Sequence, residues 1–525
     1  MRYLILDDSI CNTRFRKHMN VVEIDGNNLS IEESIAISQG KIKVKLSNNA
    51  IVKMQKSRDA VESIVSSDDV VYGINTGFGA LSSVKVDLED LDTLQSNLIR
   101  SHACGIGDNM EPEHVFIMML FRANSLAKGY SGCRVEIVEL LLTLINLRIA
   151  PVIPRIGSLG ASGDLAPLSH MALVLIGEGE CYIEEDGGWN IYDSKYVLSK
   201  RGINPIILKA KEGLSLINGT SQMCAYLCYT IRNLEQLLMV ADFSLACSLE
   251  SIKGSHSPFD NRIHEVRPQK GQLISAARIS GLLKNSQIKD SHKDCDRVQD
   301  AYCFRCGPQV HGPAIEALIE SRRILEIEIN SATDNPLVFV NEGKVDIISG
   351  GNFHGQNLAI ASDKLAIICH EIAVISERRI NQILDPQWSN LSAFLTNKEG
   401  LESGLMIIQY VAAAIISELH LLANPATTSN VPVSMGKEDH VSMGATGTYR
   451  SLKSSKYLSQ VLANELICAT EALERLNESP GLGVKKIKDW VRTKVDKLDG
   501  DKSLTKECEE LSSSIINGEM SEIFG

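Results

Sequence analysis

The sequence lacks an excess of positive charge, and it lacks the features of an exported protein. Its net charge is −12 and its pI is near 5.6, which argues against nucleic acid or an anionic membrane as a partner. Acidic residues at positions 7 and 8 interrupt the amino-terminal apolar run before it reaches the length of a signal peptide. We therefore expect a cytoplasmic protein.

Cysteine is present without the spacing of a disulfide framework. The 13 cysteines are odd in number and scattered, so free thiols in a reducing compartment are expected. Cys303 and Cys306 have CxxC spacing, but no strand and helix pattern of the thioredoxin kind adjoins them. His292 and Cys295 lack a second ligand pair at zinc spacing, and we expect no metal site.

No long apolar stretch is free of charge. The most apolar long stretch, residues 221–249, contains Arg232, Glu235 and Asp242, which predicts a buried bundle helix rather than a membrane span. Internal repeats and low-complexity linkers are also absent. With 525 residues, 44% of them hydrophobic, the chain can bury a large core, and we expect two packed domains or lobes.

Apolar residues at helical spacing dominate the chain. The predicted long helices cover residues 114–128, 134–147, 221–249, 313–330, 362–380, 406–422 and 446–476. Strand signals are few, and the clearest are hairpins at 181–192 and 337–348. The predicted fold is mainly α, a long-helix bundle with an N-terminal lobe of mixed loops and shorter helices and a few short β-hairpins.

The boundary between the two lobes is predicted near Asn218, which gives an N-terminal lobe of residues 1–218 and a helical-bundle lobe of residues 219–525. Helices this long and apolar usually bury against more than one neighbour. An oligomer built on a central helical bundle is therefore expected.

One short run carries distinctive chemistry. Residues 157–168, GSLGASGDLAPL, centre on Ala161-Ser162-Gly163. The Gly163 nitrogen can attack the Ala161 carbonyl carbon, and loss of two waters leaves a methylidene-imidazolone (MIO) ring whose exocyclic carbon was the Ser162 side chain. Gly163 allows this approach because it has no Cβ. Taken alone, the tripeptide is more typical of a turn in which Asp164 caps the following helix.

The whole run resembles the active-site segment of the MIO-dependent aromatic amino acid ammonia-lyases and aminomutases. The resemblance extends over about residues 22–470 and leans towards the histidine ammonia-lyases. It implies that Ala161, Ser162 and Gly163 form the MIO group within the N-terminal lobe and that no metal or diffusible cofactor is needed. It also implies a homotetramer in which loops of three subunits line each site.

Three motifs before residue 219 acquire roles from this resemblance. The run VYGINTGFG places the catalytic tyrosine at Tyr72, which positive potential would have to hold partly ionised before it could remove a carbon-bound proton. In NLIRSHACG, His102 matches a residue that faces the substrate side chain. In EGLSLINGT, Asn218 matches the asparagine that contacts the MIO group, although Asn-Gly alone predicts a turn.

Later motifs supply the residues that would contact the substrate carboxylate and the MIO group. In residues 297–310, Arg305 would bind the substrate carboxylate as a bidentate partner. Tyr302 would contact the MIO group or assist proton transfer, and Gln299 would contact the substrate. In SGGNFHGQ, Phe353 matches the residue that the family stacks near the electrophile.

The predicted substrate depends on His102, which indicates a polar ring in the pocket, and on Glu438 and Met406. Histidine-specific members place a glutamate at the position of Glu438, where phenylalanine- and tyrosine-specific members place glutamine. A carboxylate there can accept the imidazole N–H or help to remove the β-proton. Met406 matches the methionine that borders the imidazole pocket. Gln356, where histidine-specific members often carry an acid, departs from the pattern, as do residues 427–435.

These observations predict a carbon–nitrogen lyase that eliminates ammonia from L-histidine to give trans-urocanate, a step of histidine degradation. The departures at Gln356 and 427–435 leave open an aminomutase, which would re-add the amine at the β-carbon, and a tyrosine ammonia-lyase is a further alternative. A non-catalytic structural oligomer is an alternative of another class. The presence of the tripeptide, Tyr72 and Arg305 argues against it.

Overall fold

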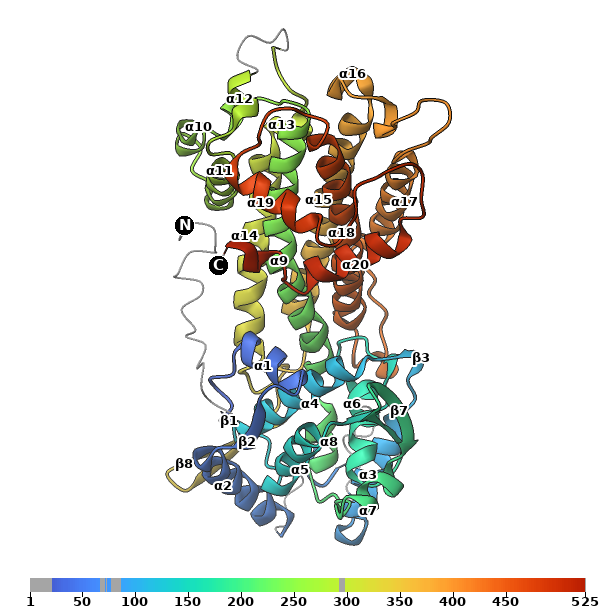
Figure 1. The fold of residues 1–525 in the computed structure, drawn as a ribbon. Coiled ribbons are helices and arrows are strands. Elements are labelled where there is room, and N and C mark those ends of the chain that lie inside the picture. The colour runs from blue at the N-terminus through green and yellow to red at the C-terminus, as the bar shows by residue number, and fades with distance from the viewer. Residues whose placement is uncertain (1–20, 67–70, 72, 77–85, 292–297, 525) are drawn as a thin grey trace.

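Helices make up most of the protein in this computed structural model, which describes residues 21–66, 71, 73–76, 86–291 and 298–524. Figure 1 shows a bundle of long helices in its upper half and a mixed region of shorter elements below it. The prediction of a mainly α fold is confirmed. The lobe boundary near Asn218 stays a prediction.

The centre of the bundle is α9 (Ser221–Ser251), a helix of 31 residues. At 1.5 Å per residue it spans about 45 Å. Nearly all of its side chains are buried, which is the pattern of a helix surrounded on every side. Its long neighbours are α14 (Gly307–Glu328), α15 (Gln356–Leu384) and α18 (Gly444–Leu473), and α11 (Lys270–Leu282), α17 (Met406–Leu422), α19 (Leu482–Val491) and α20 (Thr505–Ile516) lie around them. Short helices α10 (Asn261–Glu265), α12 (Gln287–Ser291), α13 (Tyr302–Arg305) and α16 (Pro386–Ser389) lie towards the upper end in Figure 1.

The lower region contains the shorter helices. They are α1 (Ile31–Ser38), α2 (Asn48–Val65), α3 (Leu91–His102), α4 (Pro112–Ala127), α5 (Val135–Asn146), α6 (Leu165–Leu175), α7 (Ser194–Lys200) and α8 (Glu212–Ile217). Of these, α4 is buried around its whole circumference, so it forms the core on which the others pack.

Small sheets complete this region. A parallel pair joins β1 (Val21–Ile24) and β2 (Lys43–Leu46), and antiparallel pairing joins β3 (Ile106–Asn109) with β5 (Pro154–Ile156). A three-stranded sheet has the order β4 (Ile149–Pro151), β6 (Glu180–Glu185), β7 (Gly188–Asp193). The hairpin β8 (Leu337–Asn341) and β9 (Lys344–Ile348) comes later in the chain, yet Val338 N donates to Tyr130 O at 2.8 Å.

The predicted elements match the structure closely, with two informative differences. Helix α14 begins at Gly307, six residues before the prediction, because Pro308 fits the first turn of a helix and Pro313 is accommodated inside it. Helix α15 extends the prediction at both ends. The two hairpins form at the predicted residues, and β4 adds a third strand to the first of them.

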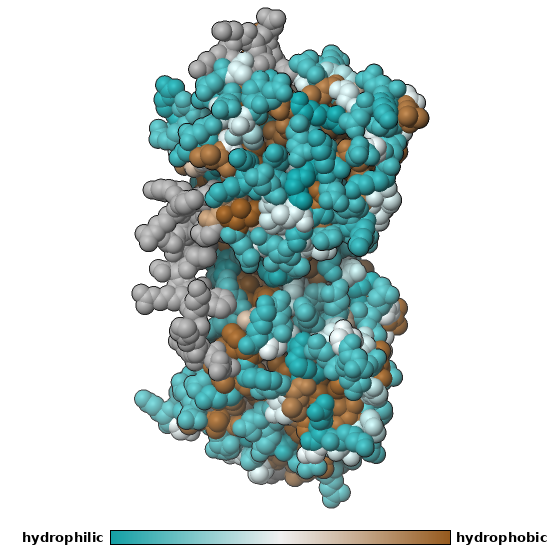
Figure 2. Space-filling model, in the orientation of Figure 1, coloured by the Kyte–Doolittle hydropathy of each residue, from teal (hydrophilic) through white to brown (hydrophobic). Residues whose placement is uncertain are grey.

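Helix α17 is the exception to the burial of the bundle. The segment 406–428 has a mean hydropathy of 1.7, and only 22% of its most apolar 18-residue stretch is buried. Length and composition alone would therefore allow it to cross a membrane. The side chains of Ile407, Tyr410, Val411 and Leu421 are about half or more exposed. The face of the molecule seen in Figure 2 is otherwise mostly hydrophilic, with hydrophobic patches interspersed.

A buried ion pair joins two of the central helices. Arg379 of α15 and Glu465 of α18 are both fully buried, with Arg379 Nη2 2.8 Å from Glu465 Oε2. The hydroxyls of Ser248 and Ser376 also donate to this carboxylate. Each charge is therefore compensated only while its partner is present.

We predict that Arg379→Met lowers the free energy of unfolding by about 3–5 kcal/mol, because it leaves the Glu465 carboxylate buried with only two hydroxyl donors. Urea unfolding followed by helical circular dichroism measures the change. Lys364→Met, which removes an exposed ion pair with Glu320, should unfold close to wild type. Equal stability of the two variants would contradict the assignment.

Candidate active site

The tripeptide Ala161-Ser162-Gly163 lies in the connection between β5 and α6, in a tight backbone conformation. Gly160 and Gly163 have φ values of 63° and 74°, a region that favours glycine. A Cβ on Gly163 would stand 2.2 Å from Gly219 O. Ala161 and Gly163 are buried, and Ser162 is half-buried. The backbone at residue 163 can therefore be only glycine.

The start of α9 holds one side of the tripeptide. Asn218 Nδ2 donates to Ser162 O at 2.7 Å, and Asp164 N donates to Gly219 O at 2.7 Å. Gly163 and Gly219 also form a parallel bridge. Asn218 is extended at the end of α8, not in a turn, and it directly contacts the tripeptide; its role at the MIO group stays a prediction.

Two later segments hold the other side. Gly355 N donates to Gly160 O at 3.2 Å, and Met443 N donates to Leu159 O at 2.8 Å. The Ser442 hydroxyl also donates to Gly160 O at 2.8 Å. Residues separated by about 280 positions in the chain therefore meet at this turn.

Asp164 does not cap the helix that follows it. It stands at the N-terminus of α6 without a side-chain hydrogen bond to that helix. Instead its Oδ2 accepts Gln222 N at 2.8 Å and Met223 N at 3.1 Å, in the first turn of α9, and Ser158 Oγ donates to its Oδ1. Complete burial raises the pKa of Asp164 to about 7, against the effect of these three donors.

A carboxylate contacts the tripeptide, and an imidazole lies near enough to interact with that carboxylate. Ser162 Oγ donates to Glu438 Oε1 at 3.0 Å. His102, at the end of α3, has its Nδ1 2.9 Å from Leu98 O, so the neutral ring carries its proton on Nδ1 and offers Nε2 as an acceptor. Burial lowers the pKa of His102, although the bond to Leu98 O and the charge of Glu438 partly offset this effect.

Phe353 belongs to the segment that contacts the turn of the tripeptide. Phe353 is half-buried, two residues before the Gly355 amide that binds Gly160 O. Tyr72 lies outside the described residues, as do His292 and Cys295. The described cysteines, Cys303 and Cys306 among them, are free.

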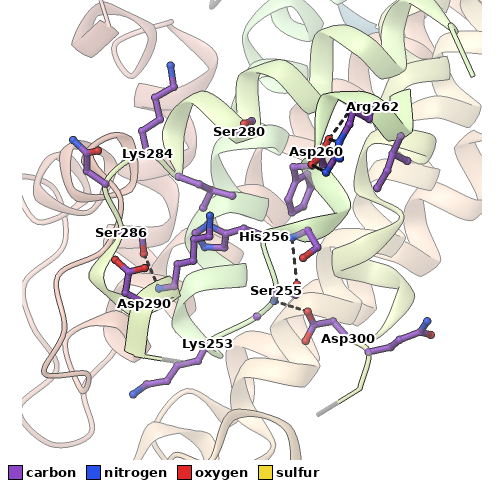
Figure 3. A pocket seen from close by; sticks show the side chains of 18 of the residues that line it. Lys253, Ser255, His256, Asp260, Arg262, Ser280, Lys284, Ser286, Asp290 and Asp300 are labelled. Carbon is purple, nitrogen blue, oxygen red and sulfur yellow. Dashed lines mark hydrogen bonds and ion pairs between the residues drawn. The ribbon is translucent and has the colours of Figure 1, made fainter. Parts of the chain in front are cut away.

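The other predicted site residues lie at the opposite end of the bundle. Tyr302 and Arg305 belong to α13, with the Arg305 guanidinium 4.3 Å from the centre of the Tyr302 ring, and Tyr302 is 69% exposed. Gln299 lines a polar cavity of about 1200 Å³ together with Lys253 and His256, shown in Figure 3. Lys253 follows the last turn of α9, whereas Asp164 binds its first turn, so about 45 Å separates the two groups.

Met406 is also remote from the tripeptide. It is the first residue of α17, and the segment that follows this helix returns towards the start of α15, where Ala426 N donates to Asp363. The 17 residues of α17 therefore place Met406 about 25 Å from that end. One chain thus brings together the tripeptide, Asn218, His102, Phe353 and Glu438, and it leaves Gln299, Tyr302, Arg305 and Met406 elsewhere.

Comparison with known proteins identifies the family of this chain. The family model described as aromatic amino acid lyase matches residues 29–493. The chain belongs to this family. It is 44% identical over 498 residues to a histidine ammonia-lyase of Myxococcus xanthus, covering 95% of this chain and 97% of the relative.

Solved structures of the family have the same fold. A histidine ammonia-lyase from Trypanosoma cruzi aligns with a TM-score of 0.88 at 36% identity, over 96% of this chain and 94% of the other. A tyrosine aminomutase from Streptomyces globisporus aligns with a TM-score of 0.88 at 36% identity, over 96% and 98%. Fold alone therefore does not separate a lyase from an aminomutase.

The residues present fit the MIO group of this family. Ring closure requires that no side chain stand on Gly163, and the Gly219 backbone occupies that space. Asn218 Nδ2 also donates to the carbonyl oxygen of Ser162, which would become the carbonyl oxygen of the ring. Asp164 and Gly219 were not among the predicted site residues, because their contacts join segments more than 50 positions apart.

We predict that Asp164→Asn alters the pH dependence of stability. The unfolded carboxyl has a pKa of 3.8 and the folded one about 7, so the folded state binds more protons between these values and loses stability as pH rises, by about 1.4 kcal/mol per pH unit. The asparagine variant lacks this loss but can still accept both amides.

The measurement is urea unfolding of both proteins between pH 5 and 8. The free energy of unfolding of wild type, minus that of Asp164→Asn, should fall from pH 5 to 7 and then level off. A difference that does not change with pH would show that Asp164 titrates normally.

Proposed function

We propose that this chain is an ammonia-lyase that eliminates ammonia from L-histidine to give trans-urocanate. The observation that carries the proposal is the hydrogen bond between Ser162 Oγ and the Glu438 carboxylate, at 3.0 Å. The same carboxylate lies near enough to His102 for its charge to raise the pKa of that imidazole. Similarity to histidine ammonia-lyases at 42–44% identity, over 92–96% of this chain, supports it.

The MIO group formed by Ala161, Ser162 and Gly163 would supply the electrophilic carbon that makes the substrate amine a leaving group. Asn218 would hold its carbonyl oxygen by the bond it now makes to Ser162 O. Tyr72 would remove the β-proton. Phe353 would pack near the reacting atoms, and no diffusible cofactor would be required.

The polar groups near the tripeptide would select the substrate side chain. Glu438 offers a carboxylate and neutral His102 offers Nε2, so both accept a hydrogen bond. An imidazole supplies an N–H to these half-buried acceptors, whereas a phenyl ring would cover them without supplying a donor. A phenol also donates, so tyrosine is the appropriate comparison substrate.

The remaining groups would come from other copies of the chain. Gln299, Tyr302 and Arg305 stand at the far end of the bundle, and Met406 is also distant. Antiparallel packing of two copies brings opposite ends together, and the exposed apolar face of α17 is a surface that such packing would bury. We propose a cytoplasmic homotetramer in which Arg305 of one subunit binds the substrate carboxylate held at the tripeptide of another.

An aminomutase is not favoured. The curated relatives at 42–44% identity are named histidine ammonia-lyases, whereas the tyrosine aminomutase structures share 34–36%. The departures at Gln356 and residues 427–435 are therefore compatible with the lyase.

We predict that purified protein converts L-histidine to urocanate, followed by its ultraviolet absorbance, with one ammonia released per urocanate. Glu438→Gln should lower kcat/KM for histidine by about 100-fold or more, because the amide cannot act as a base and is a weaker acceptor. Accumulation of a β-amino acid would indicate an aminomutase, and coumarate formed faster from tyrosine would change the substrate. Release of neither ammonia nor product would support a structural oligomer.

We predict that two inactive variants restore activity when they assemble together. Arg305→Met and Glu438→Gln damage opposite ends of the bundle, so mixed oligomers would contain some sites with both intact groups. Co-expressed variants carrying different tags, purified for both tags, should turn over histidine faster than either alone. His102→Leu with Glu438→Gln is the control, because both changes fall on the same end and no site regains both groups. Equal activity of the two mixtures would contradict shared sites.

A further inference from the structure

Arg122 of α4 and Arg379 are the largest fully buried side chains among the described residues, and Arg122 reaches the segment that supports the tripeptide. Its Nη1 donates to Asn218 O at 2.8 Å and to Thr333 O at 3.3 Å. One guanidinium therefore connects three parts of the chain: α4, the junction between α8 and α9, and the segment that precedes β8.

The residues that Arg122 holds are the ones that hold the tripeptide. Asn218 Nδ2 donates to Ser162 O, and Gly219 O accepts Asp164 N. A Cβ on Gly219 would stand 2.0 Å from Arg122 Nη1, so the guanidinium packs directly against this backbone. Gly219 thus has Arg122 on one side and Gly163 on the other, and a shift of Arg122 would be transmitted to the tripeptide.

The charge of Arg122 is poorly compensated. Its Nε and Nη2 have no hydrogen-bond partner among the residues that the structure describes. Asp334 acts on its charge, but that carboxylate is already paired with Lys211 at 2.9 Å, and both are fully buried. Arg122 and Lys211 thus share one carboxylate, that of Asp334. An apolar side chain of similar volume would avoid this cost, which points to a role other than stability.

We propose that Arg122 is a positioning residue for ring closure at Ala161-Ser162-Gly163. By fixing Asn218 O, it keeps the Asn218 side chain on Ser162 O and the Gly219 backbone against Gly163. The inference rests on the proposed function, because it concerns the ring that the lyase requires.

The ring closes without any co-reactant. A bond forms between the Gly163 nitrogen and the Ala161 carbonyl carbon, and the Ala161 oxygen leaves as water with the two protons from the nitrogens of Ser162 and Gly163. The Ser162 hydroxyl and its Cα proton leave as the second water. The first step requires the Gly163 nitrogen to stand against the Ala161 carbon, and its rate depends on the fixed turn.

The test measures ring formation directly, apart from turnover. Trypsin cleaves after Arg155 and Lys195, which releases residues 156–195, and mass spectrometry distinguishes the closed form by the loss of two waters. Chains made by cell-free synthesis and sampled over time give the closure rate. Thermal midpoint and elution volume, measured on the same samples, report folding and assembly.

Arg122→Met should close the ring about tenfold or more slowly than wild type. Arg122→Lys should be slowed by about threefold, because an ammonium on a different side chain replaces the single guanidinium nitrogen, Nη1, that reaches both carbonyls. Ser125→Ala is the matched control: Ser125 also lies on α4 and its hydroxyl binds Thr333, but it does not touch Asn218. The control should close the ring at the wild-type rate.

The outcomes separate this inference from the proposed function. A wild-type peptide that retains both waters would refute the function itself. A closed ring in wild type and equally fast closure in the Arg122 variants would overturn the inference alone. If Arg122→Met does not fold, Arg122→Lys decides, since closure as fast as in Ser125→Ala at an equal thermal midpoint also overturns it. Closure rates that simply follow the thermal midpoint across all variants would reduce Arg122 to a structural role.

Discussion

The contact between the Gly163 and Gly219 backbones is the constraint on which the site depends. Only glycine at position 163 allows this approach, because a Cβ there would stand 2.2 Å from Gly219 O. The approach places the Asn218 amide on Ser162 O and the Asp164 side chain on the first turn of α9. Because α9 is the centre of the bundle, the turn that carries the tripeptide is fixed by a long helix that is buried along nearly its whole length.

The length of α9 has a second consequence. The same helix that holds the tripeptide at its first turn leads at its last turn into the cavity lined by Gln299. A rigid helix of 31 residues cannot bring these two groups together within one chain. The proposed reaction therefore depends on assembly, and the exposed apolar face of α17, which would be a liability in a monomer, is consistent with that dependence.

The sequence predicted the long helices and both hairpins because periodicity reports the burial of each segment by itself. The resemblance indicated Asn218, His102 and Glu438 as site residues, and their roles stay predictions. In the structure Asn218 and Glu438 bind Ser162, and His102 lies near Glu438. It did not predict where the Asp164 side chain binds, because the local rule assigns a cap to the nearest helix and the actual contact is with Gln222, 58 positions away. The separation of Arg305 from Ser162 was equally hidden, since a motif gives a residue's identity but not its position in space.

The electrostatics of the two sides of the tripeptide differ in a way that suits the proposed reaction. Behind it lie the positive end of α9, a buried Asp164 whose pKa near 7 keeps it partly protonated, and the undercompensated guanidinium of Arg122. In front lie the Glu438 carboxylate and the neutral ring of His102. Positive potential behind favours electron density moving onto the Ser162 carbonyl oxygen, and acceptors in front favour a side chain that donates hydrogen bonds. If Asp164 were fully ionised it would cancel the helix dipole at this point, so its burial is part of the arrangement that keeps the back of the turn positive.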